Sequence, residues 1–182
     1  FKLLYIKHTV ILMTKDIIMS TINVVIVFDA ENILKRYPSS KDPNNPKSID
    51  GKDIYMVTTS DNVIGGQGGG DLNIKAEVED VIHWREVSIS HTEHSVILYK
   101  FETTYGGNLI SNAEPRIANV DLPMPNPENS LTPNMSQEKD YYWSAEILST
   151  GSVAYDFRFQ IFDRHGNLCG CYKWDPYITI KQ

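Results

Sequence analysis

Residues 65–85 read GGQGGGDLNIKAEVEDVIHWR, and this stretch decides how the chain is interpreted. Five glycines come first, and then Leu72, Ile74 and Ala76 alternate with polar residues. Such alternation is typical of a β-strand with one face buried and the other in water. A charged turn then leads into VIHWR, which has the character of a second strand. The question is whether the glycines hold a phosphate or connect two strands.

The glycine loop fails the test for nucleotide binding. A dinucleotide fingerprint needs G-x-G-x-x-G between a strand and a helix. Counted from Gly66 the third glycine falls at Asp71, and counted from Gly68 it falls at Asn73. No G-K-[ST] follows, and the next segment has strand periodicity, so the helix N-terminus that would bind a phosphate is missing. A flexible connector that allows close backbone approach is therefore favoured.

Outward from this stretch, short apolar or alternating runs are separated by turn residues. Asp29 is expected to cap a short helix that Pro38 ends. Pro115 places its strand at a sheet edge, because proline cannot donate to a ladder. Residues 123–137 carry four prolines and are expected to form the longest surface loop. The expected strands are residues 23–28, 54–59, 72–78, 81–89, 95–104, 115–121, 141–149, 153–162, 168–173 and 177–180.

These nine or ten strands predict an all-β protein with one short helix after the first strand. Their spacing favours an antiparallel β-sandwich with Greek-key connections, either Ig-like or cupredoxin-like. We assign residues 19–182 to a single domain, since this length suits one core. Residues 1–18 are treated as an N-terminal extension of doubtful origin. Charged residues interrupt its apolar run, which favours an amphipathic helix or a disordered tail over a membrane anchor.

The bulk charge and the cysteines restrict the partners and the compartment. The net charge is −6 and the sequence pI is about 5.3, which argues against nucleic acid and anionic membranes. Cys169 and Cys171 lie two residues apart, a spacing that on a strand bars an easy mutual disulfide. No disulfide framework is implied, so a reducing compartment is expected. No cofactor is expected.

The sequence offers little support for catalysis. It contains no nucleophile elbow of the form G-x-S-x-G, and acid pairs such as Glu77 and Glu79 are expected to face solvent. We therefore propose no catalytic residues. The alternative is a metal-binding cupredoxin-like protein or a metal-dependent enzyme that uses His91 and His94, with His165 as a further ligand. Because residues 91–94 lie between two expected strands, a solvated turn is favoured and no metal ligands are assigned.

Aromatic residues among polar loops indicate a shallow sugar-binding site. Tyr37 and Trp174 could stack on the apolar face of a sugar, and Gln67, Asp71 and Asp175 could bind its hydroxyl groups. Loops on a rigid sandwich often carry function, which makes these positions reasonable. The competing interpretation is that Trp174 belongs to the core.

Four strings carry a resemblance to a known family. They are ILKRYPSSKDPNNP (33–46), IYMVTT (54–59), QGGGDLNIKA (67–76) and GCYKWDPYITI (170–180). Together they resemble the PixA/AidA inclusion body protein family over residues 19–182. This chain departs from the family pattern at Gly65-Gly66, where a small polar residue and a glycine are expected. It also has Glu79-Asp80 where the family tends to Gly-Asp.

The resemblance implies a bacterial protein that accumulates in cytoplasmic inclusion bodies and is released on lysis. It implies no enzymatic activity and no agreed catalytic residues, and carbohydrate recognition has been suggested for relatives. We therefore expect a non-enzymatic, self-associating protein with lectin-like carbohydrate binding through its loops. Its expected partners are copies of itself, as a homo-oligomer or a crystalline assembly, and glycans.

Overall fold

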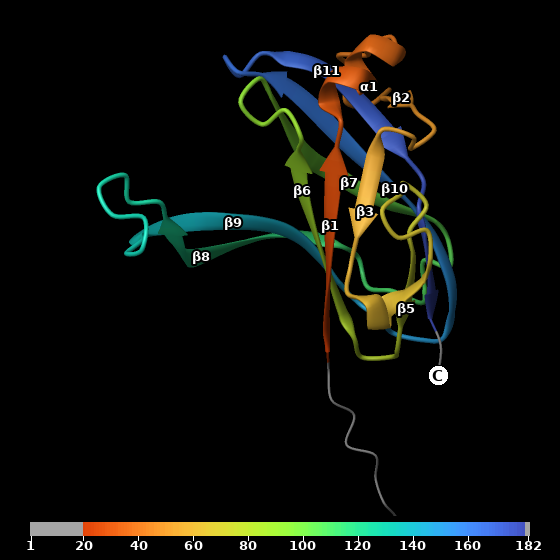
Figure 1. Cartoon of the computed structure of the whole chain (residues 1–182). Helices are drawn as coiled ribbons and strands as arrows, with labels where there is room; N and C mark the ends of the chain where they lie inside the picture. Colours follow the sequence, from red (N-terminus) through yellow and green to blue (C-terminus); the bar gives the residue numbers. More distant parts are fainter. Residues whose placement is uncertain (1–19, 181–182) are drawn as a thin grey trace, which may run out of the picture.

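The computed structural model describes residues 20–180, which form two facing β-sheets and one short helix (Figure 1). The prediction for residues 1–18 lies outside the described residues. The elements are β1 (Thr21–Phe28), α1 (Ala30–Arg36), β2 (Lys47–Ser48), β3 (Ile54–Val57), η1 (Ser60–Asn62), β4 (Val63–Gly65), β5 (Asn73–Ala76), β6 (Val81–Ser88), β7 (His94–Tyr105), β8 (Glu114–Met124), β9 (Asn134–Glu146), β10 (Gly151–Asp163), β11 (Leu168–Trp174) and β12 (Tyr177–Ile180).

The first sheet has the order β3-β1-β6-β9-β8, and the second has the order β2-β11-β10-β12-β5-β4, with β7 also paired to β10. The expected all-β, sandwich-like fold with one short helix is confirmed. The sheets are mixed, however, and not purely antiparallel. β1 runs parallel to β6, β11 to β2 and β12 to β5. Hydrophobic alternation fixes which face of a strand is buried but says nothing about the direction of its neighbour.

The core lies between the two sheets and is rich in aromatic rings. Along β10, Tyr155, Phe157 and Phe159 all face inward and are fully buried, as their alternation predicts. Phe157 stacks on Trp174 with 5.7 Å between ring centroids, and meets Trp84 edge-on at 5.6 Å. Each buried ring removes roughly 150–250 Å² from water, so this cluster supplies much of the drive for the two sheets to pack.

The glycine loop packs against β3 at the edge of the first sheet. The Gly68 N–H donates to the Met56 carbonyl at 2.9 Å, and the Met56 N–H donates to the Gly69 carbonyl at 3.1 Å. Gly70 lies so close to Gly51 that an added Cβ would stand 2.5 Å from the Gly51 carbonyl oxygen. The glycines therefore permit close backbone approach and cover an open strand edge, as the connector interpretation predicts.

A long hairpin of β8 and β9 leaves the body of the molecule as a two-stranded arm, which we define as residues 117–141 (Figure 1). The prediction of an irregular loop over residues 123–137 was wrong at both ends, because Pro123 pairs with Met135 and Met124 with Asn134. The exposed ribbon has the polar, proline-rich composition of a loop, and prolines are tolerated in an edge strand. β8 is the edge strand of its sheet, as Pro115 predicts.

Candidate functional site

Trp174, a predicted sugar-stacking residue, belongs to the core. Its side chain is buried, and the indole Nε1 donates to the Gly70 carbonyl at 3.2 Å. The ring therefore has no free face for a sugar, and the competing interpretation is the one that the structure supports. Because Trp174 bonds to Gly70, it joins the two loops that carry Asp71 and Asp175, whose side chains are both exposed.

Two other predicted ligand-binding residues, Gln67 and Tyr37, form hydrogen bonds with other residues of the chain. The Gln67 amide donates to the Thr58 carbonyl at 2.7 Å and accepts from the Thr58 N–H at 3.2 Å, so it extends the pairing of the glycine loop with β3. The Tyr37 hydroxyl donates to the Asp50 carboxylate, which also binds Lys52 at 2.7 Å. These bonds to Lys52 and Tyr37 hold the pKa of Asp50 well below its usual range.

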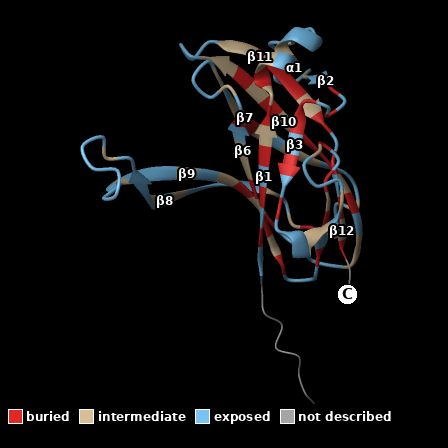
Figure 2. Ribbon diagram, in the orientation of Figure 1, coloured by how far each residue is buried: buried red, intermediate tan, exposed pale blue. Residues whose placement is uncertain are grey.

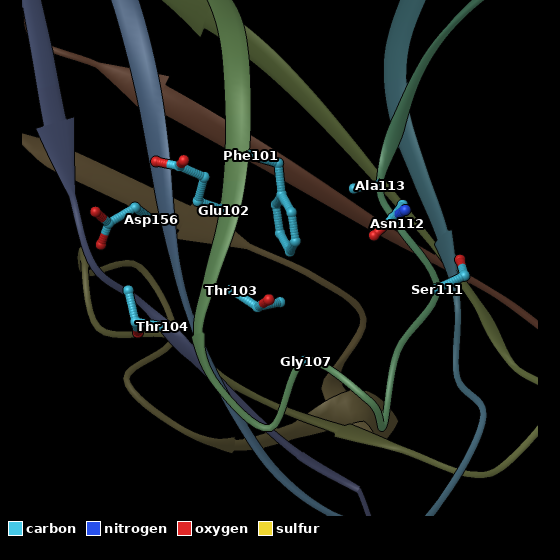
Figure 3. Close-up of a pocket in the computed structure, with 9 residues that line it drawn as sticks. All are labelled: Phe101, Glu102, Thr103, Thr104, Gly107, Ser111, Asn112, Ala113 and Asp156. Carbon is cyan, nitrogen blue, oxygen red and sulfur yellow. The ribbon is translucent and has the colours of Figure 1, made fainter. Parts of the chain in front are cut away.

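A polar cleft of about 500 Å³ lies elsewhere, at the root of the arm (Figure 3). One wall is β7, from which the Phe101 ring points into the cleft. The other is residues 111–113, which directly precede β8. The lining residues are Phe101, Glu102, Thr103, Thr104, Gly107, Ser111, Asn112, Ala113 and Asp156. Sequence reasoning missed this site because its two walls come from separate elements and carry no motif.

The two carboxylates of the cleft are neutralised by basic neighbours. Glu102 bonds to Lys100 at 2.6 Å and also to Arg158, and the Lys100 bond is the main cause of its lowered pKa. Asp156 is nearly buried and bonds to Lys173 at 2.9 Å. With these charges paired, the groups left to meet a ligand are hydroxyls, one amide and the exposed part of the Phe101 ring, which is otherwise packed against Tyr155 and Trp84. Such a set suits an uncharged polyhydroxylated ligand better than an ion.

A clamp around Arg85 fixes the arm where it joins the body. The Arg85 Nε donates to Asp140 at 3.0 Å, and Nη1 donates to Asn23 at 2.9 Å. The guanidinium also lies 4.8 Å from the centre of the Tyr142 ring, within cation–π range. Asp140 and Tyr142 belong to β9, and Asn23 belongs to β1, so the clamp ties three strands of the first sheet together.

Glu86, the residue after Arg85 in β6, places a buried carboxyl group on the opposite face of the sheet. Glu86 Oε2 is buried and has no hydrogen-bond partner, and burial raises the pKa of Glu86 to about 7. Beside it, the Trp143 indole donates to the Leu98 carbonyl at 3.2 Å. A carboxyl group in such a place is neutral in mild acid and charges only at the cost of desolvation.

The alternative of a metal site at His91 and His94 has no complete set of ligands within residues 20–180. His91 and His165 are exposed, and the Nδ1 of His94 is buried without a partner. The Asp163 carboxylate beside them accepts from the His165 and Asn167 N–H groups at 2.8 and 2.9 Å, which makes it part of the hairpin turn. Over this range no three His, Cys, Asp or Glu residues are placed to hold a metal.

Two mixed β-sheets with a projecting arm and a polar cleft at its root define an all-β protein of sandwich-like fold. In residues 20–180 no helix has the length and apolar character to cross a bilayer. The family model for PixA, described as inclusion body protein, matches residues 20–180, and the chain therefore belongs to this family.

A solved structure with the same family description shares this fold. The crystal structure of inclusion body protein (PixA) from Burkholderia cenocepacia J2315 superposes with a TM-score of 0.80 at 16% identity. The match covers 93% of this chain and all of that one, so it shows the shared fold. No curated protein sequence matches this chain.

Proposed function

We propose that this inclusion body protein is non-enzymatic and that its copies associate through the arm. The supporting observation is that the arm is exposed along most of its length (Figure 2) and carries large apolar side chains. Ile117 and Met135 are 61% and 63% exposed on its two strands, and Leu131 is 89% exposed at its tip. A two-stranded ribbon is marginally stable alone in water, and exposed apolar patches mark contact surfaces. Contact with another copy would cover these side chains and stabilise the ribbon.

Sedimentation velocity over a wide concentration range tests this proposal. The average mass of the wild-type protein should rise with concentration, and the variant Ile117→Lys/Met135→Lys should stay monomeric. The control variant Ser39→Lys/Asn44→Lys adds the same two charges to an exposed loop of the body and should behave like wild type. A wild-type protein that remains a strict monomer at high concentration would refute the proposal.

A second proposed function is weak carbohydrate binding in the cleft at the arm root. What favours it is the combination of the Phe101 ring with hydroxyl and amide groups and paired carboxylates. A ring can stack on the apolar face of a sugar while the Asn112 amide and nearby hydroxyls bind its polar groups. This cleft takes the place of the surface around Trp174, whose ring is buried.

A glycan array, run with and without calcium, tests carbohydrate binding. Any sugar bound by the wild-type protein should bind up to about tenfold more weakly to Asn112→Ala, because one lost hydrogen bond to the ligand is worth up to about 1.4 kcal/mol. Asn108→Ala removes the same group from an exposed position that does not line the cleft, and should bind normally. An array without a hit would eliminate this function.

We further propose that the protein accumulates in cytoplasmic inclusion bodies and leaves them on lysis. The family description supports the inclusion bodies, and two free cysteines are compatible with a reducing compartment. Fractionation of producing cells should place the protein in a dense cytoplasmic pellet, and its recovery in the periplasm would contradict this location.

A further inference from the structure

The outer face of the first sheet carries a second exposed apolar surface, which we call the sheet patch. Its members come from three neighbouring strands and from the turn after β6, and they are 37–61% exposed. They are Val25, Tyr55, Val57, Val87 and Ile89.

The strand register makes the sheet patch continuous. Val25 lies directly opposite Val57 in the antiparallel pair β1–β3. The next outward-facing residue of β1, Val27, lies opposite Tyr55 on one side and Val87 on the other. Residues opposite each other on one face have Cβ atoms about 5 Å apart, so these side chains touch or nearly touch. The patch is therefore a continuous apolar surface of the kind on which a second sheet packs.

The inward side of the arm continues the core-facing side of the first sheet, but no second sheet covers it there. In β9, Trp143 and Ala145 point into the core, so Tyr141 and Met135, an even number of residues away, lie on the same inward side. Ile117 lies opposite Tyr141 and shares that side. Within the body this face packs on the second sheet. Beyond the body it continues along the arm with Ile117 and Met135 exposed.

The arm of one molecule cannot cover its own sheet patch. β9 pairs with β6 at Trp143 and Trp84, and the Arg85 clamp holds the strand at Asp140. From there the arm runs away from the body (Figure 1). A second copy is the occupant that matches both surfaces, because face-to-face sheets pack about 10 Å apart with interdigitated apolar side chains.

Charge and size favour contact between an arm and a patch over contact between two patches. The inward side of the arm carries one acidic and one basic residue, Asp121 and Lys139. Beside the sheet patch, Arg85 lies opposite Val25 on the same outer face, and its charge is paired with Asp140. No unpaired like charges therefore meet. A standard interface uses about 20–30 residues a side. Two sheet patches of five residues each would fall short of this. The strands of the arm are longer than the patch, so an arm laid across it also contacts the residues around the patch.

We propose that the arm of one copy lies with its inward side on the sheet patch of the next copy. This inference rests on the proposed self-association and names the surface that receives the arm. Because the arm and the patch are different surfaces, the contact is heterologous. Each joined pair retains one unused patch and one unused arm, so addition can continue without a fixed end point.

Mixing two variants tests the proposal. The arm-blocked variant is Ile117→Lys/Met135→Lys, and the patch-blocked variant is Val57→Lys/Ile89→Lys. Each variant alone should be monomeric at concentrations where the wild-type protein forms large assemblies. Their equimolar mixture should give a species of twice the monomer mass and nothing larger. The patch-blocked copy still offers an arm and the arm-blocked copy still offers a patch, so one contact forms and growth stops.

The possible failures are distinguishable by light scattering on the same samples. If the patch-blocked variant alone grows like wild type while the arm-blocked variant does not, the patch is not the acceptor and self-association through the arm still stands. If the mixture remains monomeric, the arm-on-patch contact is wrong. If the wild-type protein itself is monomeric, the proposed function fails. Unchanged thermal unfolding and near-ultraviolet circular dichroism would show that both variants are folded.

Discussion

Glu79 occupies a backbone conformation that favours glycine. It lies in the turn between β5 and β6 with φ +76°. A side chain in the left-handed region destabilises the folded state by about 1–2 kcal/mol. Replacing it with glycine removes this strain, but the greater conformational entropy of glycine in the unfolded chain offsets part of the gain. Glu79→Gly should therefore raise the free energy of unfolding by about 0.5–1 kcal/mol in a urea titration. Glu79→Ala keeps the Cβ and should give no such gain, so equal effects of the two variants would contradict the strain.

The stability that Glu86 contributes should decrease as the pH rises. Burial raises its pKa from 4.5 to about 7, so between these values the folded state keeps a proton that the unfolded state has lost. The contribution of Glu86 to the free energy of unfolding therefore decreases from about pH 4.5 to about pH 7, by roughly 3 kcal/mol. Glu86→Gln removes the charge and should be more stable than wild type at pH 8, with the two proteins converging near pH 4.5.

Urea titrations at half-unit pH steps measure this difference. Glu128→Gln, a matched change on an exposed loop, should track the wild-type curve at every pH. If the free energies of unfolding of the wild-type protein and of Glu86→Gln differ by a constant amount from pH 5 to pH 8, the pKa of Glu86 is not raised by burial.

At the scale of elements, the glycine loop provides a graded prediction. At Gly65 an added Cβ would contact no other atom. At Gly68 the space is also open, but the backbone φ is left-handed and disfavours a side chain. At Gly66 an added Cβ would lie 2.2 Å from the Asp71 carbonyl oxygen. The alanine variants should therefore lose roughly 0, 1–2 and more than 3 kcal/mol of stability in that order. Thermal unfolding of the three variants measures the series. A Gly66→Ala variant as stable as Gly65→Ala would contradict the close packing.

The elements also show why some of the sequence could be interpreted and some could not. The alternation in β10 identified its buried face correctly because burial acts locally along one strand. Within the arm, residues 123–137 were expected to form a loop, and their paired ends were missed because both faces of the ribbon are wet, which removes the periodic signal. Trp174 was ambiguous for a related reason: a tryptophan beside Asp175 and Pro176 suits a loop, and only the approach of Gly70 from a distant segment buries it.

At the scale of the whole molecule, the sequence predicted the fold class better than the site. Each of the ten expected strands overlaps a strand of the structure, although β9 begins seven residues earlier than expected. The parallel pairing of β1 with β6 depends on how the chain returns between them. The cleft joins residues 101–104 to residues 111–113 and Asp156, and none of these carries a recognisable signature. The predicted binding residues are instead spread over loops, with Gln67 and Tyr37 engaged in internal bonds.

Net charge should regulate the proposed assembly. The chain carries −6 at neutral pH and has a pI of about 5.3, so repulsion between copies weakens as the pH approaches that value. Average mass by light scattering at fixed concentration should increase from pH 7.5 to pH 5.5, and added salt at pH 7.5 should act in the same direction. Performing the series with Glu86→Gln separates this effect from the titration of Glu86. A mass that is independent of both pH and salt would contradict it.

The two prolines of β8 have a consequence for the material that such an assembly forms. Pro115 and Pro123 lie eight residues apart on an edge strand, so both nitrogens face the same side, and neither can donate a hydrogen bond. A further strand cannot add a continuous ladder along that edge. Dense deposits of this protein should therefore lack the cross-β reflection near about 4.7 Å and should not seed amyloid. They would be stores of native molecules, which dilution returns to solution without refolding.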